Sequence, residues 1–316
     1  MVFTDIHTHR FASDDPHAGT ADGWKIRECT SCHFVQVSPK PSESDVVSLY
    51  HEDWEHFSPY ISQTAIHRNY FNAVLDRIEQ LKREGRRQKT ENGRSKSENR
   101  KHQSSVLSPQ SSQLLSGLRL LDIGCATGIL LEEAEKRGMN ATGIDLSRDA
   151  VTACKKKKLT AIFGRVTDYV KKAKHSSYDV IVASQVIEHE YEPIAMLRAI
   201  RLLLRPGGMA LVMTPGFETP YRIIMGSGWV GYKHPEHLWF FSSGTLSHMM
   251  RYVGFGAITV SRDIPRRYEL SYAFRRLGEY NPSWGWLFGP LYRLSHVLHL
   301  TNPINPWGDI MAIAWK

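Results

Sequence analysis

Residues 120–128 read LLDIGCATG, and this short stretch decides the fold of the chain. It continues an apolar run that begins at residue 118 and is typical of a buried strand, and the pattern ILLEEAEKRG (129–138) after it predicts a helix. Gly124 and Gly128 allow a tight turn and let a ligand approach the backbone closely. The N-terminus of the following helix favours a negative group such as a carboxylate. The stretch therefore predicts a strand, a ligand-binding turn and a helix.

Two acidic side chains belong to the same predicted site. Asp122 lies in the loop motif, where its carboxylate can orient an amine or a water molecule. Asp145 ends a second predicted strand, 140–145, at the offset from Gly124 at which a carboxylate meets ribose hydroxyls in Rossmann-type sites. A nicotinamide-binding loop would read GxGxxG, but positions 126 and 129 are Ala and Ile. The loop therefore fits a pyrophosphate poorly.

Strands and helices alternate along the rest of the chain. Short apolar runs predict further strands at 159–164, 178–184, 209–214, 257–261 and 309–315. Helices are predicted after Ser147, which can serve as an N-cap, after Pro193 at a helix start, and around 244–252. This βαβ spacing implies a parallel sheet with helices on both faces.

The loop resembles the D-x-G-x-G-x-G loop of class I S-adenosylmethionine-dependent methyltransferases, with Ala126 in place of the middle glycine. Four later segments resemble, in order, motifs of the small-molecule group that includes ubiquinone-biosynthesis O-methyltransferases. They are YDVIVASQVIEHEYEP (178–193), RLLLRPGGMALVMTP (201–215), HPEHLWFFSSGTLSHMMRYVGF (234–255) and GDIMAIAWK (308–316). The resemblance covers about 118–316. It implies an α/β fold, a Rossmann-like three-layer αβα sandwich with a seven-stranded, mostly parallel sheet whose last strand is antiparallel.

The resemblance also implies the cofactor, S-adenosyl-L-methionine, and the residues around each of its parts. The methionine part would lie against Asp122, Gly124, Cys125 and Gly128. Asp145 would hold the ribose and Leu146 would pack on the adenine, with the loop 164–168, which includes Thr167 and Asp168, near that base. Ser184 and Gln185 would border the transferred methyl group.

Candidate catalytic residues are histidines, because methyl transfer to oxygen needs a deprotonated acceptor and a histidine can act as the base near neutral pH. We expect His237 in this role ahead of His234. Glu188 and His189 follow the fourth strand, and they could act as base and substrate orienter or as a structural pair that caps the next helix. The resemblance favours the structural role, because this pair recurs in relatives with different substrates.

The acceptor implied by the resemblance is a small molecule or a lipid- or glycan-type compound, lipid-linked acceptors included, and O-methylation is expected. Segments 217–240 and 264–300 would build its pocket, and their aromatic residues favour a moderately apolar acceptor. The Leu- and aromatic-rich segment 284–300 could be a lid, an interfacial helix in peripheral membrane contact, or an ordinary core helix. We expect the core helix unless its apolar face is exposed. No sequence pattern predicts an oligomeric state.

The N-terminal part holds two competing signals. DIHTH (5–9) resembles the D-x-H-x-H opening of TIM-barrel metal-dependent hydrolases, but such a barrel needs about 250 residues of βα units and residues 10–60 show none. A hydrolase therefore stays a minor alternative. Cys29 and Cys32 have zinc-ligand spacing, and His7 and His9 could complete a site. A remnant zinc ribbon and a cysteine pair without metal both fit, so no metal site is assigned.

The chain is expected to divide into four parts. They are an irregular N-terminal segment (1–62), an amphipathic helix (63–85) that Gly85 would end, a disordered basic linker (86–117) and a methyltransferase domain (118–316). The net charge is +8, and most of the excess lies in the polar stretch 82–101. A nucleic-acid methyltransferase is therefore kept only as an alternative.

Composition adds two expectations. The chain has four cysteines in 316 residues, and they form no disulfide framework, which suits a reducing cytoplasm. The N-terminus lacks the pattern of a signal peptide, and no apolar run is long enough for a membrane span.

Overall fold

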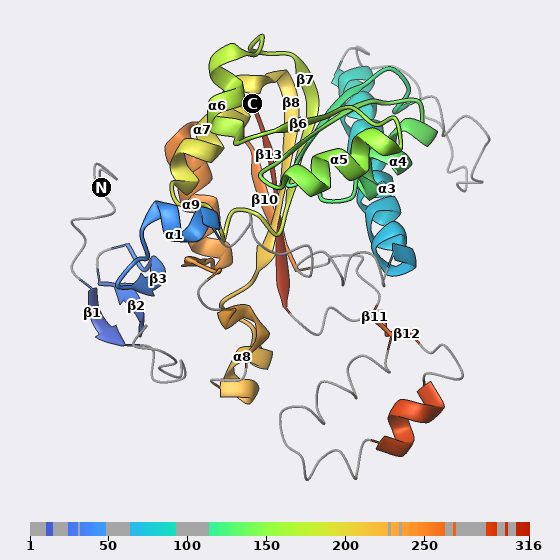
Figure 1. Ribbon diagram of the computed structural model, residues 1–316. Helices are drawn as coiled ribbons and strands as arrows, with labels where there is room; N and C mark the ends of the chain where they lie inside the picture. Colours follow the sequence, from blue (N-terminus) through green and yellow to red (C-terminus); the bar gives the residue numbers. More distant parts are fainter. Residues whose placement is uncertain are drawn as a thin grey trace.

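The computed structural model describes residues 11–14, 25–30, 32–48, 64–92, 114–226, 229–233, 236–262, 268–269, 289–295, 301–302 and 308–316. Its centre is a seven-stranded sheet in the order β10-β13-β8-β7-β4-β5-β6 (Figure 1). The strands are β4 (Arg119–Ile123), β5 (Asn140–Asp145), β6 (Ala161–Phe163), β7 (Tyr178–Ser184), β8 (Leu204–Pro215), β10 (Ile258–Ser261) and β13 (Asp309–Trp315). β13 runs antiparallel to both of its neighbours, β8 and β10, and the other neighbouring strands in the sheet pair in parallel. The predicted sheet with a reversed last strand is confirmed.

Helices cover both faces of this sheet and complete three layers. They are α4 (Ile129–Lys136), α5 (Arg148–Lys156), α6 (Val166–Lys172), α7 (Pro193–Leu203) and α9 (Ser243–Val253). Helices α4 and α5 lie on one face of the sheet and α6, α7 and α9 on the other (Figure 1). A cluster of buried apolar side chains joins the sheet to the helices on each face. Ser147 caps α5 through its hydroxyl, as its position predicts, and Ser242 forms a capping box with Thr245.

The helix before the linker belongs to the same domain and is longer than expected. α3 (Thr64–Asn92) continues past Gly85, and its buried side chains Tyr70, Val74, Leu75 and Ile78 pack in the cluster of α4 and α5. A mid-helix glycine costs only about 1 kcal/mol, so its helix can continue where neighbouring turns favour it. Residues 93–113 of the predicted linker lie outside the described residues.

Ion pairs fix α3 against α4. Arg68 Nη2 lies 2.8 Å from Glu132 Oε2, and Arg68 also bonds to Glu133. Further along, Arg137 Nη1 lies 2.6 Å from Asp76 Oδ1. These contacts join α3 to the domain built on the seven-stranded sheet, although α3 precedes the boundary predicted at residue 118.

The N-terminal part is a small sheet, which corrects the expectation of an irregular segment. β1 (Phe11–Asp14), β2 (Lys25–Cys29) and β3 (Val35–Ser38) pair in order, and β9 (Trp239–Phe240) completes the sheet. The short helix α1 (Glu43–Ser48) follows β3 (Figure 1). Because the last strand comes from the C-terminal half of the chain, local sequence pattern does not show this sheet.

The remaining elements are short. They are α8 (Pro220–Met225), a 3-10 turn η5 (Val230–Tyr232), and a separate two-stranded sheet of β11 (Tyr268–Glu269) and β12 (Thr301–Asn302). Of the segment 284–300, residues 289–295 are described, and they form a helix on which Leu291 and Leu294 are exposed, unlike a core helix. Among the described residues, no helix has both the length and the apolar character to cross a membrane.

Candidate functional site

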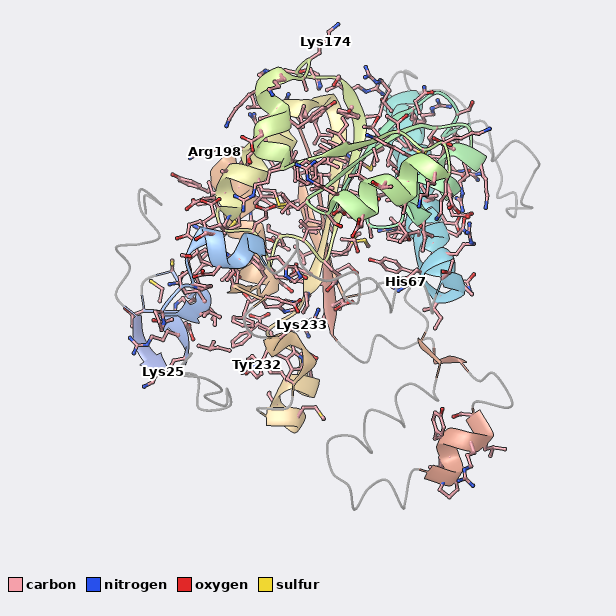
Figure 2. The ribbon with its side chains drawn as sticks, viewed as in Figure 1. Lys25, His67, Lys174, Arg198, Tyr232 and Lys233 are labelled. Carbon is pink, nitrogen blue, oxygen red and sulfur yellow. The ribbon has the colours of Figure 1, made fainter. Side chains whose placement is uncertain are left out.

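A cavity lies beside the ends of β4 and β7, where the sequence predicts the cofactor. Its walls are His67, Tyr70, Phe71, Gly124, Cys125, Ala126, Thr127, Ile129, Ser184 and Gln185. The structure therefore brings together four of the predicted site residues from two distant motifs. It also adds three residues of α3 that the sequence analysis did not assign to the site. Figure 2 shows His67 near the start of α3, beside the central sheet.

The backbone of the loop between β4 and α4 adopts conformations that favour glycine. Gly124 and Gly128 have φ angles of 73° and 79°, in the left-handed region. A Cβ atom on Gly124 would lie 2.5 Å from Val186 Cγ2, so a larger residue would clash there. Ala126 also has a positive φ, 45°, which is the conformation that the family's middle glycine would adopt without strain.

Asp145 holds this loop and the start of α5 together. Its Oδ2 accepts a hydrogen bond of 2.8 Å from the Ala126 amide, and its Oδ1 accepts one of 2.8 Å from the Ser147 amide. Burial raises the pKa of Asp145 above its ordinary value, and these amide bonds counter the rise. The side chain of Leu146 is half-buried beside it.

Asp122 is a buried carboxylate at the end of β4. Only 3% of its surface is exposed, and no described residue donates a hydrogen bond to its side chain. Burial raises its pKa well above the ordinary value, and the neighbouring Asp145 adds to the rise. A buried carboxylate without a donor is costly, so a ligand cation or donor would stabilise it.

Ser184 and Gln185 end β7 at the opposite wall of the cavity. The Ser184 hydroxyl lies 3.1 Å from the Tyr70 hydroxyl, so it links β7 to α3. Gln185 has a φ of 57°, and its side-chain Nε2 is buried without a hydrogen-bond partner among the described residues. One cavity wall therefore carries a buried amide nitrogen that has no partner among the described residues.

Other predicted cofactor residues lie away from the cavity walls. Asp168 is exposed in the first turn of α6, and its Oδ1 lies 2.7 Å from Lys171 Nζ. This ion pair lowers the pKa of Asp168. The structure gives Asp168 a partner on its own helix, and it does not bring this side chain to the cavity.

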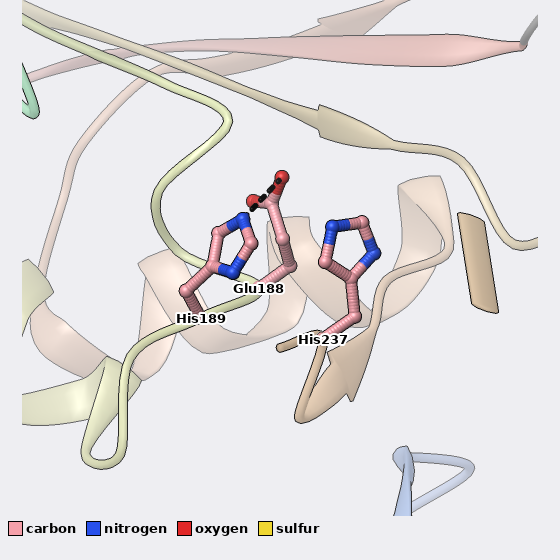
Figure 3. A group of neighbouring side chains, drawn as sticks. All are labelled: Glu188, His189 and His237. Atoms are coloured by element: carbon pink, nitrogen blue, oxygen red, sulfur yellow. Dashed lines mark ion pairs between the residues drawn. The ribbon is translucent and has the colours of Figure 1, made fainter. Parts of the chain in front are cut away.

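A second cluster of titratable groups, Glu188, His189 and His237, lies just beyond β7 (Figure 3). The His189 and His237 rings meet edge to face with centroids 4.6 Å apart. Their Nδ1 atoms lie 3.0 Å from the Glu236 carbonyl and 2.7 Å from the Gly231 carbonyl. An Nδ1 that donates to a carbonyl leaves Nε2 as the basic atom of a neutral ring. His234 lies outside the described residues.

Glu188 lies between the two imidazoles. Its Oε2 accepts a hydrogen bond of 2.9 Å from the Thr214 hydroxyl, and its Oε1 lies 3.9 Å from His189 Nε2. Burial raises the pKa of Glu188 to about 8. The carboxylate and the two imidazoles have ligand atoms within 4.8 Å of one another, a donor set that could also hold a divalent metal ion.

Replacement of Glu188 by glutamine is expected to flatten the pH dependence of stability. In the folded protein Glu188 keeps its proton up to a pKa of about 8, whereas the unfolded value is near 4.3. The stabilising contribution is complete below the unfolded pKa and is lost as the pH rises through 8. Melting temperatures measured with a chelator from about pH 5 to about pH 9 should therefore fall less for Glu188→Gln than for the wild type.

Glu135→Gln, which replaces an exposed carboxylate on α4, provides the control and should follow the wild type. Parallel curves for the wild type and Glu188→Gln would show that Glu188 is ionised in the folded protein at neutral pH.

The cysteine pair of the N-terminal sheet is compact, but its predicted partners are not described. Cys29 is buried and Cys32 is half-buried, and burial together with the nearby Cys29 raises the pKa of Cys32 to about 11. His7 and His9 lie outside the described residues.

Comparisons with known proteins show what this chain is similar to. Residues 66–260 match the family model described as "Methyltransferase domain". The ubiquinone biosynthesis O-methyltransferase of Aeromonas salmonicida (strain A449) is 35% identical over 105 residues, which cover 32% of this chain and 44% of that protein. The enzyme of that name from Ralstonia nicotianae is 36% identical over 112 residues, covering 33% and 46%. The chain thus spans less than half the length of these relatives.

A solved structure of a S-adenosylmethionine-dependent methyltransferase from Archaeoglobus fulgidus is similar at 21% identity and a TM-score of 0.45, covering 63% of this chain and 86% of that one. The family match begins inside α3 and ends in β10, and so includes the cavity and the Glu188 cluster. Because it spans more than half of the chain, this protein belongs to the methyltransferase domain family, within the class I S-adenosylmethionine-dependent methyltransferases.

Proposed function

We propose that this protein transfers the methyl group of S-adenosyl-L-methionine to a hydroxyl oxygen of a small-molecule or lipid-linked acceptor. The observation that carries the proposal is the cavity at the ends of β4 and β7. Its wall includes the Gln185 side chain, whose Nε2 is buried without a hydrogen-bond partner among the described residues. Such groups are rare in folded proteins unless a ligand or water satisfies them.

Each charged or polar part of the cofactor has a fitting group in this arrangement. The buried Asp122 carboxylate would pair with the α-ammonium group of the methionine part. Asp145 would accept bonds from the ribose hydroxyls, because a carboxylate has about four lone-pair sites and the two amide bonds leave others unused. The N-terminus of α4 would face the methionine carboxylate.

The protein's role in the reaction is chiefly to position donor and acceptor. The sulfonium supplies the methyl group when the cofactor is bound, and displacement needs the acceptor oxygen in line with the breaking bond. His237 would take the proton from the acceptor hydroxyl through Nε2, since its Nδ1 is directed to the Gly231 carbonyl. His189 and Glu188 would keep this imidazole in place and tune its basicity.

The acceptor is best described as a moderately apolar molecule. Trp229, Tyr232 and Phe240 form a buried apolar cluster with Phe217 next to the segment that carries His237. The relatives named above act in ubiquinone biosynthesis by their names, which supports a small-molecule acceptor and oxygen as the methylated atom.

A chelator distinguishes two roles for the cluster of Glu188, His189 and His237, namely proton transfer by His237 and binding of a metal ion. If His237 acts as the base, a chelator leaves turnover unchanged. Loss of turnover with a chelator and recovery with one divalent ion would instead make Glu188, His189 and His237 metal ligands.

The proposed cofactor is tested by calorimetric titration of the purified chain. S-adenosylmethionine and S-adenosylhomocysteine should both bind saturably, and NAD should not, because the loop fits a pyrophosphate poorly. A folded protein that binds neither sulfur compound would overturn the proposal.

The wall formed by α3 gives a further prediction. Tyr70→Phe removes the hydroxyl that lies 3.1 Å from Ser184 Oγ but keeps the buried ring. One hydrogen bond contributes about 1 kcal/mol, so we expect S-adenosylmethionine to bind about fivefold more weakly. Tyr252→Phe, on the far layer in α9, is the matched control and should bind normally. Unchanged affinity in Tyr70→Phe would mean that α3 closes the cavity without supporting the ligand.

A further inference from the structure

Lys40 joins the N-terminal part of the chain to the loop that carries Glu188 and His189. It lies between β3 and α1, and its Nζ donates a hydrogen bond of 2.6 Å to the Tyr191 carbonyl, 151 residues further along the chain. The same ammonium group lies 3.5 Å from the centroid of the Tyr191 ring and 5.1 Å from that of the Trp239 ring. One cation therefore contacts both the loop after β7 and strand β9.

The Lys40 side chain is half-buried and still carries its charge at neutral pH. Burial lowers the pKa of Lys40 to about 8, and the carboxylates of Glu192 and Glu43 counter the fall. Glu43 is also paired with Arg165 at the start of α6. Because a partly desolvated cation is attracted to an aromatic face more strongly than an exposed one, Lys40 is well suited to hold the Tyr191 ring.

The loop 188–191 is held through several of its carbonyl groups. The Trp239 amide donates to the Glu188 carbonyl at 3.2 Å, and the indole Nε1 of Trp239 donates to the Glu190 carbonyl at 2.8 Å. Lys40 bonds to the carbonyl that follows. The N-terminal part of the chain and β9 therefore fix this loop together.

The backbone on each side of Lys40 is itself fixed. Before it, β3 pairs with β9, and the Val37 amide donates to the Leu238 carbonyl at 3.0 Å. After it, Val46 of α1 is buried in the apolar cluster that includes residues of α7 and α9. The ammonium group is therefore presented from an ordered backbone, so that little further freedom is lost when it holds the loop.

We propose that Lys40 is a positioning residue for methyl transfer, which holds the loop after β7 so that His189 and His237 keep their contact. The inference rests on the proposed function, because it assumes that these imidazoles act on the acceptor. Their centroids are 4.6 Å apart, and the Nδ1 of His189 lies 3.0 Å from the Glu236 carbonyl. A loop released by Lys40 can move away from β9, and a shift of about 1 Å in a reacting group can lower the rate on the order of a hundredfold.

The test compares two substitutions of the lysine. Lys40→Met keeps the apolar stem but removes the charge and the donor, whereas Lys40→Arg can still donate to the Tyr191 carbonyl and lie over its ring. With a phenolic acceptor that the wild type turns over, kcat of Lys40→Met should fall about tenfold or more. Calorimetric affinity for S-adenosylmethionine should stay within about twofold of the wild type, because the loss falls on kcat. Lys40→Arg should recover most of the kcat.

Nitrogen-15 NMR of the imidazole rings reports the position of the loop without any turnover. His189→Ala identifies the His189 signals, and in Lys40→Met these should move toward those of an imidazole in water, because the bond to the Glu236 carbonyl weakens. Tyr191→Leu removes the ring under the cation and is a second variant that should shift the same signals. Lys25→Met replaces an exposed lysine of β2, so it should match the wild type in kcat and in the ring signals.

Unchanged His189 signals in the folded Lys40→Met and Tyr191→Leu variants would overturn the inference. A loss of kcat in Lys40→Met that Lys40→Arg does not recover would also overturn it, since the cation would then not be the group that holds the loop. A wild type that turns over no acceptor contradicts the proposed function instead, and the ring signals still report whether Lys40 holds the loop.

Discussion

Asp145→Ala is expected to weaken the binding of S-adenosylmethionine by about a hundredfold, or about 2.7 kcal/mol. The substitution removes the acceptor for the ribose hydroxyls, and hydrogen bonds to a charged group contribute about 1.5–3 kcal/mol each. It also removes the acceptor of the Ala126 and Ser147 amides, so the loop loses the contact that shapes it. Calorimetric titration of the purified variant measures the loss.

The control for this prediction is Asp149→Ala, which removes an exposed carboxylate from the first turn of α5 and should bind the cofactor as the wild type does. Thermal unfolding of both variants must accompany the titrations, because two amides without an acceptor also lower stability. If folded Asp145→Ala binds with wild-type affinity, the ribose lies elsewhere and the cavity at β4 and β7 is not the cofactor site.

His237→Asn is expected to lower kcat by about two to four orders of magnitude. Asparagine can still donate to the Gly231 carbonyl, which His237 Nδ1 contacts at 2.7 Å, but it has no basic atom at the position of Nε2. The variant thus removes the proposed catalytic base but keeps the hydrogen bond to the Gly231 carbonyl. The measurement is formation of S-adenosylhomocysteine with a phenolic acceptor that the wild type turns over.

Affinity for S-adenosylmethionine should be unchanged in His237→Asn, so the loss should fall on kcat alone. His248→Ala, which removes an exposed histidine from α9, should be fully active. A kcat close to that of the wild type would assign His237 the structural role. His189→Ala would then be the next variant to test, since its ring meets that of His237.

The Rossmann-like core could be predicted because its signals are local. The strands β4, β7 and β8 each contain a short apolar run, and Ser147 and Pro193 mark helix starts by their own chemistry. Asp145 could be placed from its distance to Gly124 because strand length fixes that spacing in a βαβ unit. Four of the cavity residues, Gly124, Cys125, Ser184 and Gln185, were expected near the cofactor from the resemblance to methyltransferase motifs.

The missed features depend on distant contacts. Tyr70 and Phe71 lie in the segment that the sequence predicts as an amphipathic helix, but its apolar face does not show whether it meets a core or a cavity. From the local sequence alone, Gly85 is expected to end its helix, whereas α3 continues to Asn92. Glu188, His189 and His237 meet only because the segment after β8 folds back over the end of β7.

The pairing of β3 with β9 has a consequence for synthesis of the chain. Val35 and Gln36 of β3 pair with Phe240 and Trp239 of β9. During translation, β3 therefore stays unpaired on this edge until the ribosome has made the roughly two hundred residues up to β9. At about 5–20 residues per second, that wait lasts on the order of ten seconds or more on the ribosome. During it, β3 presents an open strand edge to other nascent chains, a known route to misassembly. The N-terminal strands of this protein therefore complete their sheet late, although translation delivers them first.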